Sequence, residues 1–151
     1  MVYDNEHNST LEAFLLMTSI KDKIATWGES LSMLEGTDRL EYLLDLAKET
    51  TTLDPEKRLD ENKVHGCMSQ IWVDCHTDNN KVVVEYDSDA MITKGIAKVI
   101  CDCFTDSDIK EATTIGIDDF NPLGIQPLLT AQRRNGLGNL IHTVVNKCKK
   151  L

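Results

Sequence analysis

Alternating apolar and polar residues predict a β-hairpin in the middle of the chain. From Met68 onward, every second residue is apolar, which is typical of a half-buried strand. The inward set is Ile71, Val73 and Cys75, and the outward set is Gln70, Trp72, Asp74 and His76. Residues 77–80 (TDNN) have turn composition, and residues 81–87 (KVVVEYD) are rich in β-branched and aromatic residues. The two runs predict an antiparallel hairpin, and we also consider a third strand before Cys67.

Apolar residues at helical spacing predict two helices before this hairpin. The first lies within residues 9–33, where the apolar positions are scattered. The second runs through TDRLEYLLDLAKET, with Asp38 as its N-cap and Glu41 three residues later. The stretch 50–62 that follows is polar, contains a proline and has no periodicity. We therefore expect it to be a loop that leads the chain to Val64.

Two more helices are predicted after the hairpin. The SDAMITKGIAKVICDCF segment has Ser88 or Asp89 as its cap and carries one apolar stripe that includes Gly95. A connection at 105–127, with one helical turn at DIKEA and two prolines, leads to a last helix from about 135 to 150. Helices on both sides of one hairpin, without βαβ alternation, predict an α+β fold: a short antiparallel sheet with helices packed on one face.

Composition and charge narrow the class of protein. The chain has 151 residues, of which 41% are hydrophobic and 27% charged, so it has the size and composition of one globular domain. No apolar run approaches the length of a membrane span. Sixteen basic against 25 acidic residues give a net charge of −9, which repels a phosphate backbone. We expect a single domain, residues 1–151, that binds neither nucleic acid nor membrane.

The N-terminus and the cysteine count indicate the compartment. The first 20 residues lack a basic region, and Glu12 interrupts their apolar run, so no export signal is visible. The number of cysteines is odd, and their spacing fits neither a disulfide framework nor the paired CxxC motifs of a zinc site. We therefore expect a cytoplasmic protein with free thiols, without a metal or a cofactor.

Four of the five cysteines have simple structural explanations. Cys103 and Cys148 lie on apolar helical stripes, and Cys75 lies on the inward strand face, so all three are expected in the core. Cys101 is expected on the polar side of its helix. Because Cys101 and Cys103 project about 200° apart on a helix, they cannot bind one ion together.

Cys67 is different because it lies on no periodic face. It follows Gly66, which permits unusual backbone angles, and it precedes the strand in a loop, where reactive groups are often presented. Thiol reactivity depends on the surroundings of the sulfur. The residues alone therefore leave three alternatives for Cys67: a small hydrophobe, a metal ligand or a nucleophile.

Three motifs in sequence order resemble the SufE family of sulfur-acceptor proteins for cysteine desulfurases. They are ENKVHGCMSQIWV, YDSDAMITKGI and LTAQRRNGL. The family patterns are V-x-G-C-x-S-x-V-W, S-D-A-x-I-x-K/R-G and R-x-x-G-L. The resemblance runs from about Thr37 to Leu151. Residues 1–20 lie outside it and are expected to form a variable N-terminal extension. It implies a fold similar to the U-type iron–sulfur scaffold, in agreement with the α+β prediction.

The resemblance implies that Cys67 accepts sulfur as a persulfide. The positions that match the surrounding motifs are Gly66, Ser69, Asp89, Lys94 and Arg133. From the residues themselves, Asp89 also fits a helix cap and Lys94 a solvated helix face. Arg133 fits either a surface arginine or a group that stabilises the thiolate or binds a partner carboxylate.

The implied function is that of an accessory protein rather than an enzyme. Its partners would be a cysteine desulfurase of the SufS or CsdA type, which it would stimulate, and an iron–sulfur scaffold such as SufBCD. The oligomeric state stays open between a monomer and a homodimer. Two other classes remain: a scaffold that builds a cluster on several soft ligands, and a redox or protein-binding module in which Cys67 pairs with Cys75 or Cys101.

Overall fold

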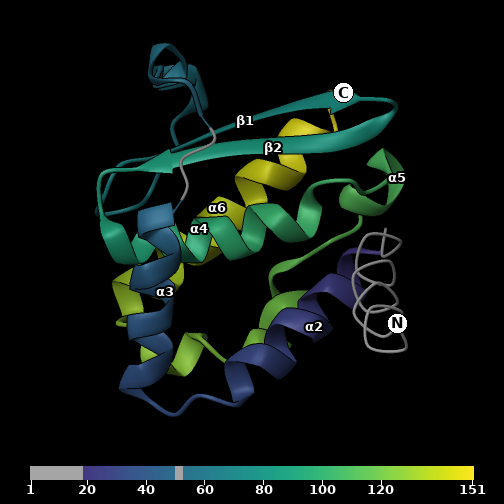
Figure 1. Cartoon of the computed structure of the whole chain (residues 1–151). Coiled ribbons are helices and arrows are strands. Elements are labelled where there is room, and N and C mark those ends of the chain that lie inside the picture. Colours follow the sequence, from purple (N-terminus) through teal and green to yellow (C-terminus); the bar gives the residue numbers. More distant parts are fainter. Residues whose placement is uncertain (1–18, 50–52) are drawn as a thin grey trace, which may run out of the picture.

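The computed structural model describes residues 19–49 and 53–151, in which helices pack against one face of a two-stranded sheet (Figure 1). The main elements are α2 (Ile20–Ser32), α3 (Thr37–Glu49), β1 (Ile71–Asp78), β2 (Lys81–Ser88), α4 (Met91–Phe104), α5 (Ile109–Ala112) and α6 (Ala131–Cys148). The connections contain the short 3₁₀ helices η1 (Pro55–Lys57), η2 (Asp60–Asn62), η3 (Ile117–Leu123) and η4 (Gln126–Leu128). The predicted α+β class is confirmed.

The hairpin forms where alternation predicted it. β1 and β2 pair antiparallel from Ile71 opposite Ser88 to Asp78 opposite Lys81. The turn between them needs only Asn79 and Asn80, whose φ angles of 51° and 64° lie in the left-handed region that asparagine tolerates and that a two-residue hairpin turn requires. A third strand is absent from the described residues. The segment before Cys67 makes only an isolated bridge, Lys63 to Trp72, so that prediction is wrong.

The core lies between the inward face of the hairpin and the helices. Val73, Val82, Val84 and Tyr86 are buried there, and α4 and α6 contact the strands from the same side (Figure 1). On its other side α4 packs against α3 so closely that a Cβ on Gly95 would lie 1.9 Å from the Leu43 carbonyl oxygen. Glycine at this position is what allows the two helices to approach.

This central position of α4 overturns one prediction about the thiols. Cys101 is completely buried rather than on a polar side, because the helix has partners around most of its surface. The predicted burial of Cys103 and Cys148 is confirmed. Cys75 is half-buried on the inward strand face.

Helix starts differ from the predicted ones in three places. Asp38 lies in the first turn of α3, which begins at Thr37, and is therefore not its cap. The cap residue of α4 is Ala90, whose N–H donates to the Ser88 hydroxyl at 3.2 Å. α6 begins at Ala131, earlier than predicted. The prediction missed its first turns because residues 131–135 are exposed and carry no apolar periodicity.

The remaining predictions about chain segments concern its first half. The helix predicted within residues 9–33 is present as α2, and the part of that prediction before Ser19 lies outside the described residues. In the predicted loop, residues 53–62 contain η1 and η2. Among residues 19–49 and 53–151, no helix has both the length and the apolar character needed to cross a membrane.

Candidate functional site

The loop that carries Cys67 is held against α6 by its neighbour Gly66. Gly66 has a φ of +82°, and a Cβ there would lie 2.4 Å from the Asn139 side-chain nitrogen. The same nitrogen donates a hydrogen bond to the Gly66 carbonyl at 3.1 Å. Both the backbone angle and the close approach therefore require glycine at this position, as the sequence suggested.

The Cys67 thiol is half-buried and faces the backbone of α6. Its Sγ lies 3.6 Å from the Gly136 carbonyl oxygen, a distance that suits a weak S–H donor. A Cβ on Gly136 would lie 3.3 Å from Sγ, so the missing side chain leaves the space that the thiol occupies. Burial raises the pKa of the Cys67 thiol. The thiol is therefore protonated at neutral pH in this arrangement.

A cavity of about 130 Å³ opens beside Cys67 between the loop, α4 and α6. Its apolar lining comes from Ile71, Ile96, Leu137 and Leu140, and its polar lining from Ser69, Thr93, Gln132 and Arg133. Met68 also lines the cavity and is 79% exposed, so an apolar side chain stands at its rim. The arrangement is a sheltered thiol beside a mostly apolar space.

Two of the residues matched by the sequence motifs, Ser69 and Asp89, hold the loop in place and make no hydrogen bond to the Cys67 thiol. The Ser69 hydroxyl lies 3.1 Å from that of Thr93, which ties the loop to α4. The Asp89 carboxylate accepts from the Gln70 N–H at 2.9 Å, and its own N–H donates to the Gln70 carbonyl at 3.2 Å. Asp89 thus joins the loop to the segment before α4, which replaces the capping role predicted for it.

Lys94 lies outside the cavity lining and belongs to a buried charge network. Its Nζ is 3.3 Å from Oδ1 of Asp87, whose side chain is only 1% exposed. Arg58 pairs with the other oxygen of Asp87, and its guanidinium carbon lies 5.5 Å from the centroid of the Trp72 ring. The network fixes the start of the hairpin, so the expectation that Lys94 is merely a solvated residue is wrong.

Arg133 is the only charged residue among the described residues that line the cavity. Its side chain is exposed in the first turns of α6, and its backbone N–H donates to the Thr130 hydroxyl at 3.3 Å. It also lines a neighbouring open groove of about 480 Å³, with Leu40, Leu44 and Met91 among its apolar members. Arg133 therefore stands between the cavity and an apolar surface.

Sequence reasoning missed the structural roles of Gly136, Asn139 and Thr93. Gly136 was matched only as part of the R-x-x-G-L pattern, although a glycine inside a helix is itself a signal of close approach. Asn139 lies three residues later and therefore on the same side of α6. The sequence offered no sign of which loop this side would meet.

Cys75 and Cys148 lie together at the far end of α6, whereas Cys101 and Cys103 are buried in α4. The Cys75 thiol donates to the Cys148 sulfur, a contact that raises the pKa of Cys75 and lowers that of Cys148. Burial raises the pKa of Cys101 well above its usual range and that of Cys103 to about 12. The core around Cys101 and Cys103 therefore holds these two thiols in their neutral, unreactive form.

This separation weakens the two alternative classes of function. Cys67 meets α6 at Gly136 and Cys75 meets it at Cys148, positions about 18 Å apart along a helix. A disulfide needs Cα atoms within about 7 Å, so a Cys67–Cys75 bond would require unfolding of the loop or the strand. In the described part of the chain, the one close group of three ligating side chains contains no cysteine, which leaves the cluster scaffold without soft ligands.

Comparisons with known proteins identify relatives. The model of the SufE family, the Fe-S metabolism associated domain, matches residues 25–148. SufE-like protein 1, chloroplastic/mitochondrial, from Arabidopsis thaliana is 36% identical over 121 residues, which are 80% of this chain but 33% of that protein. The chain thus spans about a third of that relative's length.

A bacterial relative and a solved structure extend the comparison. An uncharacterized SufE-like protein from Rhizobium etli is 32% identical over 117 residues, covering 74% of this chain and 79% of that protein. The solution structure of a hypothetical protein from Thermus thermophilus aligns with a TM-score of 0.72 over 85% of this chain and 94% of that one. At 18% identity, this likeness shows the fold alone.

Proposed function

Because the chain belongs to the SufE family of Fe-S metabolism associated domains, we propose that it is a sulfur acceptor and that Cys67 carries the sulfur. The observation that carries the proposal is the Cys67 thiol itself: half-buried, on a loop that glycine permits, and next to a cavity. The other cysteines lie in the core or face one another, so none of them competes for this role.

The proposed reaction is an exchange at sulfur that needs no oxidant. The Cys67 thiolate attacks the terminal sulfur of a persulfide on a cysteine desulfurase, and a new S–S bond forms at Cys67. The donor's S–S bond breaks, and the donor cysteine leaves as a thiolate that takes up the proton lost from Cys67. The products are a Cys67 persulfide and a free donor thiol.

The shelter around Cys67 suits a carrier of a labile group. The cavity volume of about 130 Å³ is well above the roughly 10–15 Å³ that a single water needs, so one additional sulfur atom fits. A persulfide held there is shielded from reductants and from further oxidation. The protonated resting thiol, in turn, must be exposed before it can attack, because the thiolate is the nucleophile.

Docking of the desulfurase supplies this exposure in the proposed mechanism. The Asn139–Gly66, Ser69–Thr93 and Asp89–Gln70 hydrogen bonds and the weak Sγ contact hold the loop, and docking would have to break some of them. Arg133 and the apolar groove beside it offer a charged and an apolar contact next to the thiol. Arg133 would stabilise the thiolate once Cys67 turns toward solvent.

The accessory role follows from this chemistry. Removing sulfur from the desulfurase frees that enzyme for another turnover, so the chain would stimulate it without a cofactor or a substrate reaction of its own. The Cys67 persulfide would then pass its terminal sulfur to an iron–sulfur scaffold, in keeping with the family's association with Fe–S metabolism. We expect this exchange in the cytoplasm.

The test is intact-mass spectrometry after incubation with an active SufE-dependent desulfurase, pyridoxal phosphate and cysteine. We expect a gain of one sulfur atom that reductant reverses. Cys67→Ser should abolish the gain, whereas Cys75→Ser, the matched change at the other half-buried thiol, should retain it. No gain in the wild-type chain, with a known acceptor loaded in parallel, would reject the proposal.

A further inference from the structure

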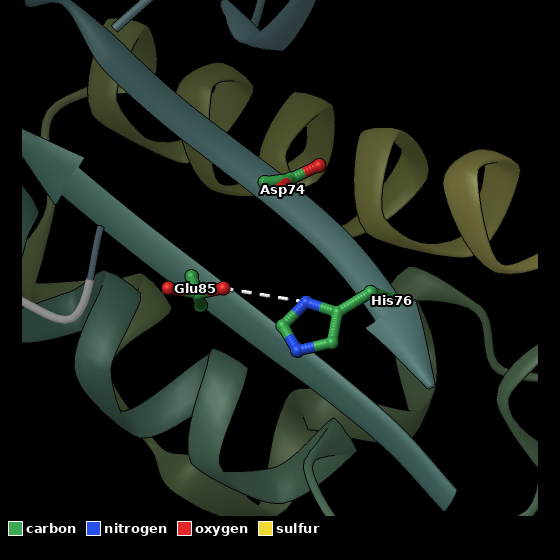
Figure 2. Close-up of side chains that lie close together, drawn as sticks. All are labelled: Asp74, His76 and Glu85. Atoms are coloured by element: carbon green, nitrogen blue, oxygen red, sulfur yellow. Dashed lines mark ion pairs between the residues drawn. The ribbon is translucent and has the colours of Figure 1, made fainter. Parts of the chain in front are cut away.

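The outward face of the hairpin gathers three potential metal ligands far from Cys67. Asp74 on β1 lies directly opposite Glu85 on β2, and His76 follows Asp74 by two residues, so all three side chains project from the same face. Figure 2 shows the imidazole of His76 reaching from β1 toward Glu85. One ligating atom from each residue lies within 4.8 Å of the other two.

The three side chains are partly withdrawn from solvent and stand on a stiff support. The exposed fractions are 28% for Asp74, 21% for Glu85 and 45% for His76. The paired strands fix the spacing of the three Cα atoms, which lowers the ordering cost of binding an ion. Partial burial also weakens the screening of the two carboxylates by water and salt.

A cation already occupies the edge of this cluster. The Lys57 ammonium lies 3.4 Å from Asp74 Oδ2 and 3.7 Å from Glu85 Oε1. The two carboxylates therefore favour positive charge at this point. Lys57 is 45% exposed on the short helix η1, and its flexible side chain is free to swing into solvent.

We propose that Asp74, His76 and Glu85 bind a divalent transition-metal ion such as Zn²⁺, which displaces the Lys57 ammonium. An imidazole with two carboxylates suits Zn²⁺ and its first-row neighbours better than Mg²⁺ or Ca²⁺, which prefer oxygen ligands alone. Two atoms bound to Zn²⁺ at about 2.0–2.1 Å lie about 3.3 Å apart at the tetrahedral angle. His76 Nδ1 and Glu85 Oε1 are 3.3 Å apart, which matches this separation.

Three protein ligands leave one tetrahedral position open, for water or for a side chain of another molecule. The cluster shares no residue with the Cys67 cavity, so the proposal stands or falls independently of sulfur transfer. The proposal gives the solvent-facing side of the hairpin a role in metal binding that is separate from the role of Cys67.

The test is a titration of the full, chelator-treated chain with ZnCl₂ at neutral pH, followed by calorimetry, with a phosphine reductant to keep the thiols reduced. We expect one ion per chain, with affinity lowered roughly tenfold or more by His76→Ala or Glu85→Gln, as losses around metal sites usually are. Lys57→Gln should raise the affinity by removing the competing cation. His142→Ala, a matched change at an exposed histidine of α6, should leave it unchanged.

Two results would overturn the proposal. One is the absence of binding up to about 1 mM Zn²⁺, which is weaker than a useful site. The other is binding that His76→Ala leaves intact and Cys67→Ser abolishes, which would assign the ion to the thiol. The position of the bound ion can be found by adding paramagnetic Co²⁺ to ¹⁵N-labelled protein. We expect the broadened amide signals to centre on residues 74–76 and 83–85. Broadening centred on residues 64–70 would refute the proposal.

Discussion

Replacing Gly136 by alanine tests whether the backbone of α6 sets the chemistry of Cys67. The new Cβ would lie 3.3 Å from Cys67 Sγ, a separation at which the sulfur must shift by a few tenths of an ångström. The shift would loosen the 3.6 Å contact with the Gly136 carbonyl and push the thiol toward solvent. Because burial raises the pKa of Cys67, we expect Gly136→Ala to lower that pKa toward its ordinary value.

The same change should not destabilise the fold. Alanine is about 1 kcal/mol more favourable than glycine inside a helix, and the neighbour that must move is a loop side chain. We therefore expect the melting temperature to stay constant or to rise by up to about 2–4 °C. General loosening of the structure would raise the reactivity of the thiol and lower the melting temperature together. A more reactive thiol with an unchanged melting temperature would therefore indicate a local effect at Cys67.

The assay is the rate of alkylation of Cys67 by iodoacetamide as a function of pH, read by intact mass. Below the pKa the rate follows the thiolate fraction, so each unit by which the pKa falls raises the rate by up to about tenfold, less the accompanying loss of thiolate nucleophilicity. Gly138→Ala is the matched control, since its Cβ would meet only the Ile117 side chain, with Cδ1 at 3.1 Å, and no part of the loop. Identical pH profiles for wild type, Gly136→Ala and Gly138→Ala would refute the reasoning.

Three further predictions concern stability. Gly66→Ala should cost about 1–3 kcal/mol in urea denaturation, because it adds strain at a φ of +82° to a clash with Asn139; an unchanged midpoint would contradict this. Asp87→Asn should cost about 3 kcal/mol, because it leaves Arg58 and Lys94 without their buried counter-charge; a loss below ~0.5 kcal/mol would show that the network contributes little. Cys103 has its pKa raised to about 12, so the folded state retains a proton that the unfolded chain loses above about pH 8.5. Its contribution is complete below that pH and declines toward pH 12 by up to about 1.4 kcal/mol per unit, and Cys103→Ala should flatten the decline measured by denaturation between pH 8 and 11.

Two surface variants serve as controls for these measurements. Gly36→Ala places alanine at a φ of +48° with nothing within 4 Å, so it isolates backbone strain from the clash at Gly66. Lys48→Ala removes a pair with Asp45 in which both side chains are about 70% exposed, so it should change stability by less than about 1 kcal/mol.

Local sequence patterns predicted the elements that have one face against the core and the other toward solvent. Apart from the buried pair Trp72 and Asp87, the outward face of the hairpin is polar and partly exposed, and the inward face is mostly buried. The turn residues are asparagines, so alternation and turn chemistry both applied. The prediction that Cys101 lies on the polar side was wrong because α4 contacts the sheet, α2, α3 and α6. These contacts leave only a narrow, partly exposed stripe, which includes Lys98 and Asp102. The prediction of where α6 starts was wrong for the opposite reason, because residues 131–135 are exposed and carry no apolar pattern.

The loop position of Cys67 could be predicted, but the surroundings of its thiol could not. The glycine before it and its loop position were visible in the sequence, and the φ of +82° confirms the reason for that glycine. The contacts that define the cavity join Cys67 to Gly136 and Gly66 to Asn139, across 69 and 73 residues of sequence. Such contacts depend on how α6 packs against the hairpin, which no local pattern contains.

The distance between the two ends of α6 has a kinetic consequence for a carrier. Cys67 contacts α6 near one end, and the Cys75–Cys148 pair lies about 18 Å further along the helix. Cys101 and Cys103 are buried in α4, so a sulfur atom at Cys67 has no accessible second cysteine among the described residues. Under the proposed function, each visit to a donor therefore loads a single atom, and each visit to a recipient delivers it. The sulfur flux would then be set by how often the chain associates and dissociates, and a partner that binds too tightly would slow it.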